Sequence, residues 1–359
     1  MSSLIVLQGR PYHKFINAIK SEETKEEYRR CLLRYLSHHK TTLYDMLTLP
    51  IADIENMLVD YLLDLRKQDL SSSYINLNFC ALKLYYFMND VRINKEKIGK
   101  YLGESKRKNV DRCYTHPEIK SLLEIADLRL KVVISVLAST GMRIGALPPL
   151  KLSHLEKKGD VYKFKIYENT KDESICFCSP ECANYIDSYL EFRTRSGEHL
   201  DDKEHTYLIR EQFDINDIEQ IRKQGRSIAR DSIANMLYLL TIKAGLRKVN
   251  HQFTGRERKP VPLAHGFRKF FTTQLINSKV NPEIREMLLG HSIGLAGAYY
   301  KPTEDEMLDE YLKTADNLTI NEENRLRKKV EKLEVEKTQI EALALELEKV
   351  KKAIERVNK

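Results

Sequence analysis

The sequence predicts a mainly α-helical protein with a small antiparallel β-sheet. Long stretches of the 359-residue chain carry apolar side chains every three or four positions, the spacing of one helix face. Residues 161–178 instead alternate apolar and charged side chains on both sides of a polar turn, which is typical of a β-hairpin. Residues 321–359 contain no Gly or Pro and carry an apolar residue at every seventh position, which predicts a long terminal helix.

Residues 1–103 are expected to form a helical domain. Apolar side chains recur at helical spacing within residues 28–36, 54–65 and 74–87. Acidic residues precede the first of these stretches, where they suit the helix dipole. Ser71 opens a serine cluster that can cap the third.

A basic segment without apolar periodicity, residues 104–114, follows this domain. Its positive charges near the middle and end are Lys106, Arg107, Lys108 and Arg112. This composition is typical of a solvated linker.

Residues 115–316 are expected to form a second domain that contains the hairpin. Thr115 is a suitable helix start, and the apolar run 132–138 predicts a buried helix that ends at Gly141. The hairpin turn carries Lys171 at its tip. Further helices are predicted over residues 180–195, 227–244, 265–277, 282–289 and 304–315.

The tail, residues 317–359, predicts a coiled coil. Its heptad positions are Leu326, Leu333, Ile340, Leu347 and Ile354. A second set of positions, four residues after each of these, would share the contact with a partner helix. It is less apolar because it contains Lys337 and Lys351, so we expect the tails of two chains to associate only modestly. The alternative is a single amphipathic helix that lies on its own body.

The composition is that of an intracellular protein with an excess of positive charge, which suits a partner that carries phosphate groups. The formal net charge is +8, and most of the excess lies before residue 317. No apolar run is long enough to cross a membrane, and no signal peptide is recognisable. Six cysteines in a chain of this length do not suggest a disulfide framework. We therefore expect a cytoplasmic protein, and the positive charge by itself supports association with DNA only weakly.

Three cysteines, Cys176, Cys178 and Cys182, raise the question of a zinc site. Their spacing is not that of a common zinc pair, and the first two fall on one face of a predicted strand. We therefore predict buried thiols and no metal, although a fourth ligand could come from His154, His199 or His205.

Five residues have the chemistry to attack a phosphodiester. His265 and Arg268 are three positions apart and so share a helix face. His291 follows Gly290, Tyr300 lies nine residues after His291, and Arg143 follows the buried helix. Arginine offsets phosphate charge, and a phenol can act as the nucleophile. No Gly-rich phosphate loop accompanies them, so neither ATP nor another cofactor is implied.

These motifs resemble the boxes of the tyrosine recombinase (phage integrase) family. Thr140-Gly-Met-Arg143, His265-Gly-Phe-Arg268, Leu289-Gly-His291 and Tyr300 stand in the family's order and spacing. The resemblance is close over residues 115–316 and loose before them. The sequence around His291 and Tyr300 is more similar to archaeal integrases than to bacterial ones.

The resemblance implies a fold and partners. Residues 115–316 would adopt the family's DNA breaking-and-rejoining fold, and residues 1–103 would form a core-binding domain that completes a clamp on duplex DNA. The basic linker residues would then lie against backbone phosphates. A homotetramer on paired recombination sites is implied, with the segment after the tyrosine, residues 304–315, docked on a neighbouring protomer.

The resemblance also assigns roles within a metal-free and ATP-independent cleavage. Arg143 and Arg268 would clamp the phosphate, and His265 and His291 would add donors. Tyr300 would attack, with Tyr299 as the alternative one position away. Lys171 would protonate the departing 5′-oxygen, with Lys165 as the alternative.

One position departs from the family pattern. The first box usually carries an acidic residue three positions after its arginine, and Ala146 stands there in this chain. Arg143 or His265 therefore lacks the neighbouring carboxylate that the family usually provides at this position.

Two other functions use similar residues. A type IB topoisomerase has a comparable catalytic set but relaxes supercoils alone. A binding-only protein would hold DNA and assemble through its tail without covalent attachment. The complete set of reactive residues favours the recombinase.

Overall fold

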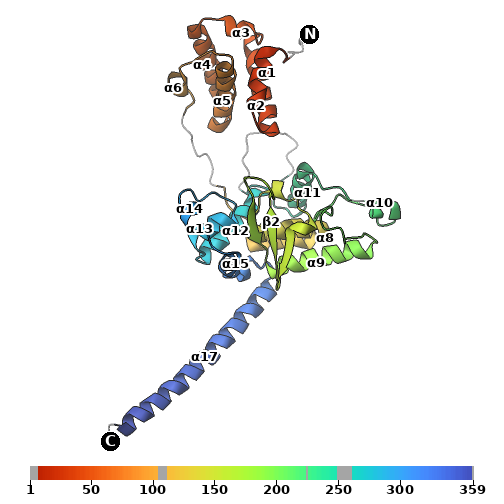
Figure 1. The fold of residues 1–359 in the computed structure, drawn as a ribbon, viewed down its shortest axis with the longest axis vertical. Coiled ribbons are helices and arrows are strands. Elements are labelled where there is room, and N and C mark those ends of the chain that lie inside the picture. Colours follow the sequence, from red (N-terminus) through yellow and green to blue (C-terminus); the bar gives the residue numbers. More distant parts are fainter. Residues whose placement is uncertain (1–6, 104–110, 224, 249–260, 358–359) are drawn as a thin grey trace. The chain divides into compact units, whose positions relative to one another are not determined.

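The computed structural model describes residues 7–103, 111–223, 225–248 and 261–357, which form two compact units (Figure 1). The first unit lies within residues 7–103. The second begins at Asp111 and contains the sheet. Each unit has its own hydrophobic core.

The first unit is helical, as predicted. Serine side chains cap two of its longer helices, because Ser21 accepts from the Thr24 N–H and Ser71 from the Tyr74 N–H. Buried tyrosines contribute to its core, and the Tyr85 hydroxyl donates to the Leu43 carbonyl at 2.8 Å. The helices are α1 (Arg10–Asn17), α2 (Glu22–His39), α3 (Asp45–Thr48), α4 (Ile51–Lys67), α5 (Ser72–Met88) and α6 (Lys95–Gly99).

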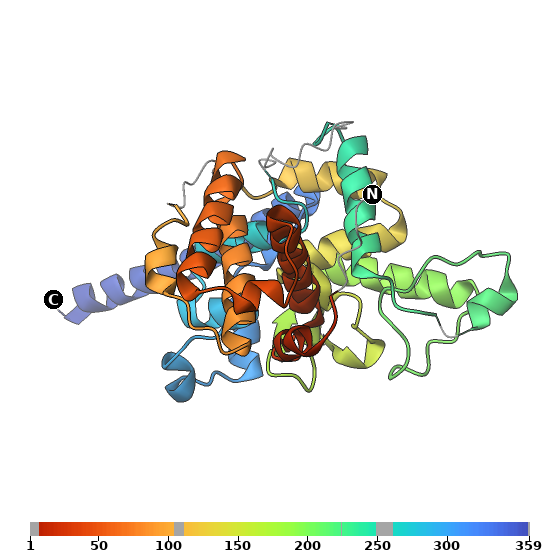
Figure 2. The ribbon, with the colours of Figure 1, turned by 90° about the horizontal axis from the view of Figure 1, so that it is seen from above.

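Helix α8 (Leu128–Thr140) is the centre of the second unit. All its residues from 132 to 140 are buried. Helices α9 (Pro180–Arg195) and α12 (His265–Asn277) pack against it, and both have the bounds that the sequence predicts (Figure 1, Figure 2). An apolar run without a polar face suits a helix that is enclosed on all sides.

The sheet has three antiparallel strands in the order β1 (Leu155–Lys158), β2 (Val161–Ile166) and β3 (Ser174–Phe177). Strands β2 and β3 form the predicted hairpin, with Phe164 opposite Cys176. Strand β1 was not predicted. Three of its four residues are charged, so it lacks the alternation of a half-buried strand, and its backbone pairing with β2 defines it.

Seven further helices precede the long helix at the end of the described chain. They are α7 (His116–Ile125), α10 (Ile218–Arg222), α11 (Arg230–Lys243), α13 (Pro282–Leu288), α14 (Ala296–Tyr299), α15 (Glu304–Leu312) and α16 (Ala315–Leu318). Two single-turn helices, η1 (Ile144–Ala146) and η2 (Leu152–His154), precede the sheet.

Helix α15 packs on its own unit. Tyr311 is fully buried, and its hydroxyl donates to the Ser139 carbonyl of α8 at 2.9 Å. Lys163 of β2 pairs with Glu304 at 2.7 Å. Met307 and Tyr311 thus pack in the core of their own chain. The docking of residues 304–315 on a neighbouring protomer, which the family resemblance implies, stays a prediction.

The chain packs in the core of the second unit up to Ile320. The Asn317 carbonyl lies 2.7 Å from His116 Nε2, and Leu318 and Ile320 are only 1% and 5% exposed. Helix α17 (Glu322–Val357) begins after them. The large apolar side chains that the structure describes along this helix are more than half exposed, so no described part of the chain covers them: Leu326, Val330, Leu333, Val335, Ile340, Leu343 and Leu347. In the part of the chain that the structure describes, no helix is long and apolar enough to span a bilayer.

Candidate active site

The turn after α8 presents the first arginine. Gly141 ends α8 with φ 64°, and a Cβ at this position would lie 2.2 Å from Cδ1 of Phe271, so glycine is required on both grounds. Arg143 follows with extended backbone at the start of η1. Its guanidinium is exposed and forms no ion pair with any described residue.

The second arginine, Arg268, is buried and joins two helix ends. It is 7% exposed. Its Nη1 donates to the Gly141 carbonyl at 2.8 Å and its Nη2 to the Leu289 carbonyl at 2.6 Å. These two residues cap the C-termini of α8 and α13, where carbonyls are unpaired and the helix dipole is negative. The buried positive charge is therefore stabilised by two helix C-termini.

Arg268 stays charged at neutral pH. Burial, followed by the neighbouring charge of Arg143, lowers the pKa of Arg268 to about 10. That value still leaves the guanidinium protonated near pH 7. Two like charges held close together in this way create a site for an anion.

His291 completes a chain of contacts with Arg268. Its Nε2 lies 2.7 Å from Nη2 of Arg268, and its Nδ1 lies 2.7 Å from Oε2 of Glu286. Gly290, with φ 65°, turns the chain at the end of α13, and the His291 N–H returns to the Glu286 carbonyl at 2.9 Å. The hydrogen bond from His291 is the main reason that the pKa of Glu286 is lowered.

His265 is the first residue of α12, one helical turn before Arg268. Partial desolvation lowers its pKa, and the positive charges of Lys269, Arg268 and Arg143 lower it further. The imidazole is therefore neutral near pH 7 and can accept a proton.

Tyr167 lies beside this cluster and was not predicted. It follows β2 with φ 55°, a backbone conformation that bulky residues rarely adopt. Its hydroxyl lies 3.8 Å from where a Cβ on Gly145 would be, two residues after Arg143. Burial raises the pKa of Tyr167, and the charges of Arg143 and Arg268 only partly offset that rise. Its place directly after an alternating strand is the only sequence signal.

The three lysines of the hairpin differ in their partners. Lys171 is exposed in the β2–β3 turn and pairs with no carboxylate among the described residues. The hydrogen bond to Glu168 is the main cause of a raised pKa at Lys165. The carboxylates that engage the other two are Glu156 (2.5 Å) and Glu304 (2.7 Å) for Lys163, and Glu168 (3.0 Å) and Glu173 (3.5 Å) for Lys165.

The adjacent tyrosines differ in exposure. Tyr299 ends α14 and is 90% exposed, whereas Tyr300 follows it and is 36% exposed. Neither hydroxyl forms a hydrogen bond with a described residue, so the structure does not join either phenol to the arginines.

Three of the four basic linker residues, Lys106, Arg107 and Lys108, lie outside the described residues. Arg112 is held on its own chain, because its guanidinium makes two hydrogen bonds to Glu118, of 2.8 and 2.6 Å. Arg112 is also the main cause that lowers the pKa of Glu118 to about 2. A DNA phosphate would have to share Arg112 with this carboxylate.

Cys176, Cys178 and Cys182, which were considered as zinc ligands, are buried free thiols in the core of the second unit. Over the described ranges, no group of three or more His, Cys, Asp or Glu side chains is placed so that it could hold a metal ion.

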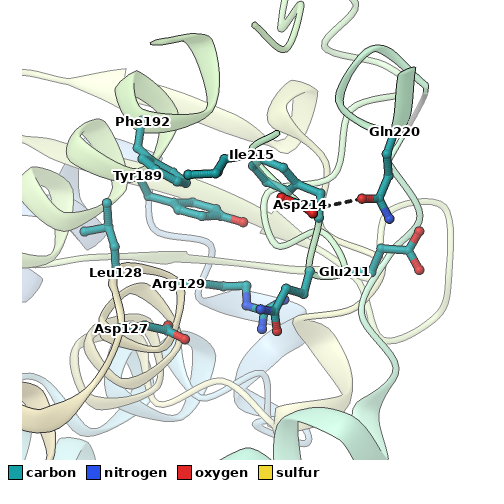
Figure 3. Close-up of a pocket in the computed structure, with 11 residues that line it drawn as sticks. Asp127, Leu128, Arg129, Tyr189, Phe192, Glu211, Asp214, Ile215 and Gln220 are labelled. Carbon is teal, nitrogen blue, oxygen red and sulfur yellow. Dashed lines mark hydrogen bonds between the residues drawn. The ribbon is translucent and has the colours of Figure 1, made fainter. Parts of the chain in front are cut away.

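A cavity of about 800 Å³ lies away from the arginine cluster (Figure 3). Aromatic and apolar side chains line it with a few charged ones, and Gln220 accepts the Asp214 N–H at 2.8 Å. It shares no lining residue with the cluster, and it contains no histidine, cysteine or lysine.

Known proteins match this chain in sequence and fold. Residues 107–306, more than half of the chain, match the Phage integrase family. "Tyrosine recombinase XerC" of Leptospira interrogans serogroup Icterohaemorrhagiae serovar copenhageni (strain Fiocruz L1-130) is 23% identical over 218 residues, or 60% of each chain. The match therefore spans less than two thirds of that relative.

Two solved structures share the fold. The Tn1549 transposon integrase, in complex with transposon right end DNA, is 17% identical with a TM-score of 0.55, and the match covers 85% of this chain and 98% of that one. The XerH site-specific recombinase bound to difH substrate is 17% identical with a TM-score of 0.51, and covers 79% and 78%.

The two arginines should respond differently to substitution by lysine. Arg268→Lys leaves at least one buried carbonyl unpaired, because one ammonium cannot bridge both helix ends and His291. We expect a loss of about 1–3 kcal/mol in the free energy of unfolding. Arg143→Lys, at an exposed and unpaired position, should change it by less than about 0.5 kcal/mol. Urea unfolding of both variants measures this, and equal losses would contradict the structural role of Arg268.

Proposed function

Because the chain belongs to the phage integrase family, we propose that it is a site-specific DNA recombinase. It cleaves and rejoins DNA strands through a 3′-phosphotyrosyl intermediate, without metal or ATP. The observation that carries this proposal is the buried Arg268, bonded to His291 and held beside the exposed Arg143. Metal-free phosphoryl transfer depends on such fixed positive charge around the phosphate.

Arg268 retains N–H groups that can donate to a phosphate. A guanidinium has five N–H groups, and the two carbonyls and His291 use three of them. The N–H on Nε and one on Nη1 remain for non-bridging phosphate oxygens. The exposed guanidinium of Arg143 supplies further donors, so both arginines can offset charge that grows in the transition state.

The cleavage step moves one proton at each end. The Tyr300 oxygen bonds to phosphorus while the bond from phosphorus to the 5′-oxygen breaks, so the strand is left attached through its 3′-phosphate. The neutral His265 is suited to take the phenolic proton, and Lys171 gives one to the 5′-oxygen. Lys163 and Lys165 are poorer acids because carboxylates already hold their ammonium groups. Attack by a 5′-hydroxyl reverses these transfers and rejoins DNA.

Tyr300→Phe should abolish covalent attachment to DNA and leave binding nearly intact, because only a hydroxyl is removed. Tyr299→Phe, the matched control next to it, should remain active. Incubation with a suicide substrate, followed by denaturing electrophoresis and peptide mapping, measures both. Swapped results would move the nucleophile by one position. Binding without attachment by the unaltered protein would identify a binding-only protein instead.

Lys171→Ala should slow cleavage by about 10²- to 10⁴-fold, the usual contribution of a general acid. A bridging 5′-sulfur leaves with little need for a proton, so this substrate should restore cleavage by Lys171→Ala. It should not restore Arg143→Ala, since the charge on the non-bridging oxygens is unchanged. Rescue of Lys165→Ala in place of Lys171→Ala would reassign the acid.

Assembly into a tetramer on paired sites is assigned to α17 rather than to α15. Helix α15 is occupied by its own core, whereas the heptad face of α17 is open. A second copy with the same exposed stripe is the partner that this pattern fits.

Removal of α17 by ending the chain after Asn321 should preserve cleavage of a suicide substrate but weaken recombination between paired sites. This end point keeps Leu318 and Ile320 in the core. Leu333→Glu with Ile340→Glu should act like the truncation, and Thr338→Glu with Gln339→Glu, off the heptad face, should not. Light scattering with and without DNA measures assembly. Unchanged assembly and recombination after truncation would exclude this role, and relaxation of plasmid without a target site by the monomer would indicate a topoisomerase.

A further inference from the structure

The site formed by Arg143, His265, Arg268 and His291 contacts a carboxylate through His291, whose partner is Glu286. Among the described residues, no other acidic side chain forms a hydrogen bond or ion pair with Arg143, His265, Arg268 or His291. Ala146, where the family usually has an acid, is 1% exposed and offers no polar group. The carboxylate of this site therefore comes from α13 instead of the turn after Arg143.

Both neighbours of His291 select the same tautomer. The guanidinium of Arg268 has donors only, so the His291 Nε2 at 2.7 Å must accept and carries no hydrogen. The single hydrogen of the neutral ring is then on Nδ1, where Glu286 Oε2 accepts it at 2.7 Å. The ring is thereby held from both sides.

Glu286 is itself fixed in place. Its backbone carbonyl accepts the His291 N–H at 2.9 Å, and Arg285 Nε lies 3.2 Å from its Oε1. The left-handed turn at Gly290 brings the two residues together. The same residue thus holds both the backbone and the ring of His291.

From these contacts, and resting on the proposed function, we propose that Glu286 is a positioning residue for strand cleavage. Its carboxylate keeps Nε2 of His291 directed at Arg268 and at the phosphate that Arg268 binds. A diester oxygen can only accept a hydrogen bond, so His291 must take a proton from solvent at Nε2 and exchange its contact with Arg268 for one with that oxygen. The Glu286 carboxylate on the opposite nitrogen keeps the ring aligned and offsets that charge.

Single-turnover cleavage of a suicide substrate at saturating protein tests the role. Glu286→Ala should slow cleavage on the order of 10- to 100-fold, as expected for loss of a partner that orients a histidine. Non-covalent DNA affinity, measured in the Tyr300→Phe background, should not change. Glu286→Gln should lose less, because its amide oxygen can still accept the Nδ1–H.

A double-mutant cycle separates positioning from a general structural effect. Glu286 acts through His291, so Glu286→Ala combined with His291→Ala should cleave no more slowly than His291→Ala alone. Rate losses that multiply in the double variant would overturn the proposal. Glu283→Ala, one turn earlier on α13, is the matched control and should cleave at the rate of the unaltered protein.

The tautomer can be read without any cleavage. Nitrogen-15 NMR of the DNA-free protein should show His291 with its hydrogen on Nδ1, because the contacts with Arg268 and Glu286 both select this form. A hydrogen on Nε2 in the unaltered protein would overturn the proposal. If the unaltered protein shows the Nδ1 form but never attaches to DNA, the positioning contact stands and the recombinase function fails.

Discussion

The arrangement of Arg143, His265 and His291 depends on the buried positive charge of Arg268. An unpaired guanidinium in a protein interior costs several kcal/mol, so the chain around Arg268 must supply acceptors. It does so with the carbonyls of Gly141 and Leu289, which two helix ends leave unpaired. The need to satisfy Arg268 therefore sets where α8 and α13 end relative to α12.

This constraint also builds the reactive cluster. Gly141 leads within two residues to Arg143, and Leu289 leads within two residues to His291. Once Arg268 bonds both carbonyls, these side chains are drawn toward one place although the sequence separates them widely. Left-handed glycines at positions 141 and 290 make both turns possible. The stability of this unit and the proposed chemistry therefore rest on the same contacts.

Charge pairing then distinguishes residues that composition treats alike. Three lysines lie on one hairpin, yet carboxylates engage Lys163 and Lys165 and leave Lys171 at the tip. Packing makes a similar distinction between helices. Tyr311 holds α15 against α8, whereas α17 presents its apolar face to solvent. At both places, the proposed function uses the group that no described residue engages.

Much of this protein follows from the sequence alone. Local periodicity was enough for α9, α12 and the β2–β3 hairpin, because one buried face repeats within each segment. The boxes around Arg143, His265, Arg268, His291 and Tyr300 were recognisable because their spacing is local. Strand β1 was not, since a charged edge strand has no alternation and is defined only by its neighbour.

Tertiary structure decided the contacts that join distant segments. Glu286 is an ordinary acidic helix residue until Gly290 turns His291 back onto it. Tyr167 follows a strand without any motif, and its place near Arg143 depends on how the hairpin packs. Residues 317–320 belong to the core because His116 and the surrounding helices receive them. The physical reason is common to all three: a hydrogen bond or buried contact between distant residues leaves no periodic trace in either segment.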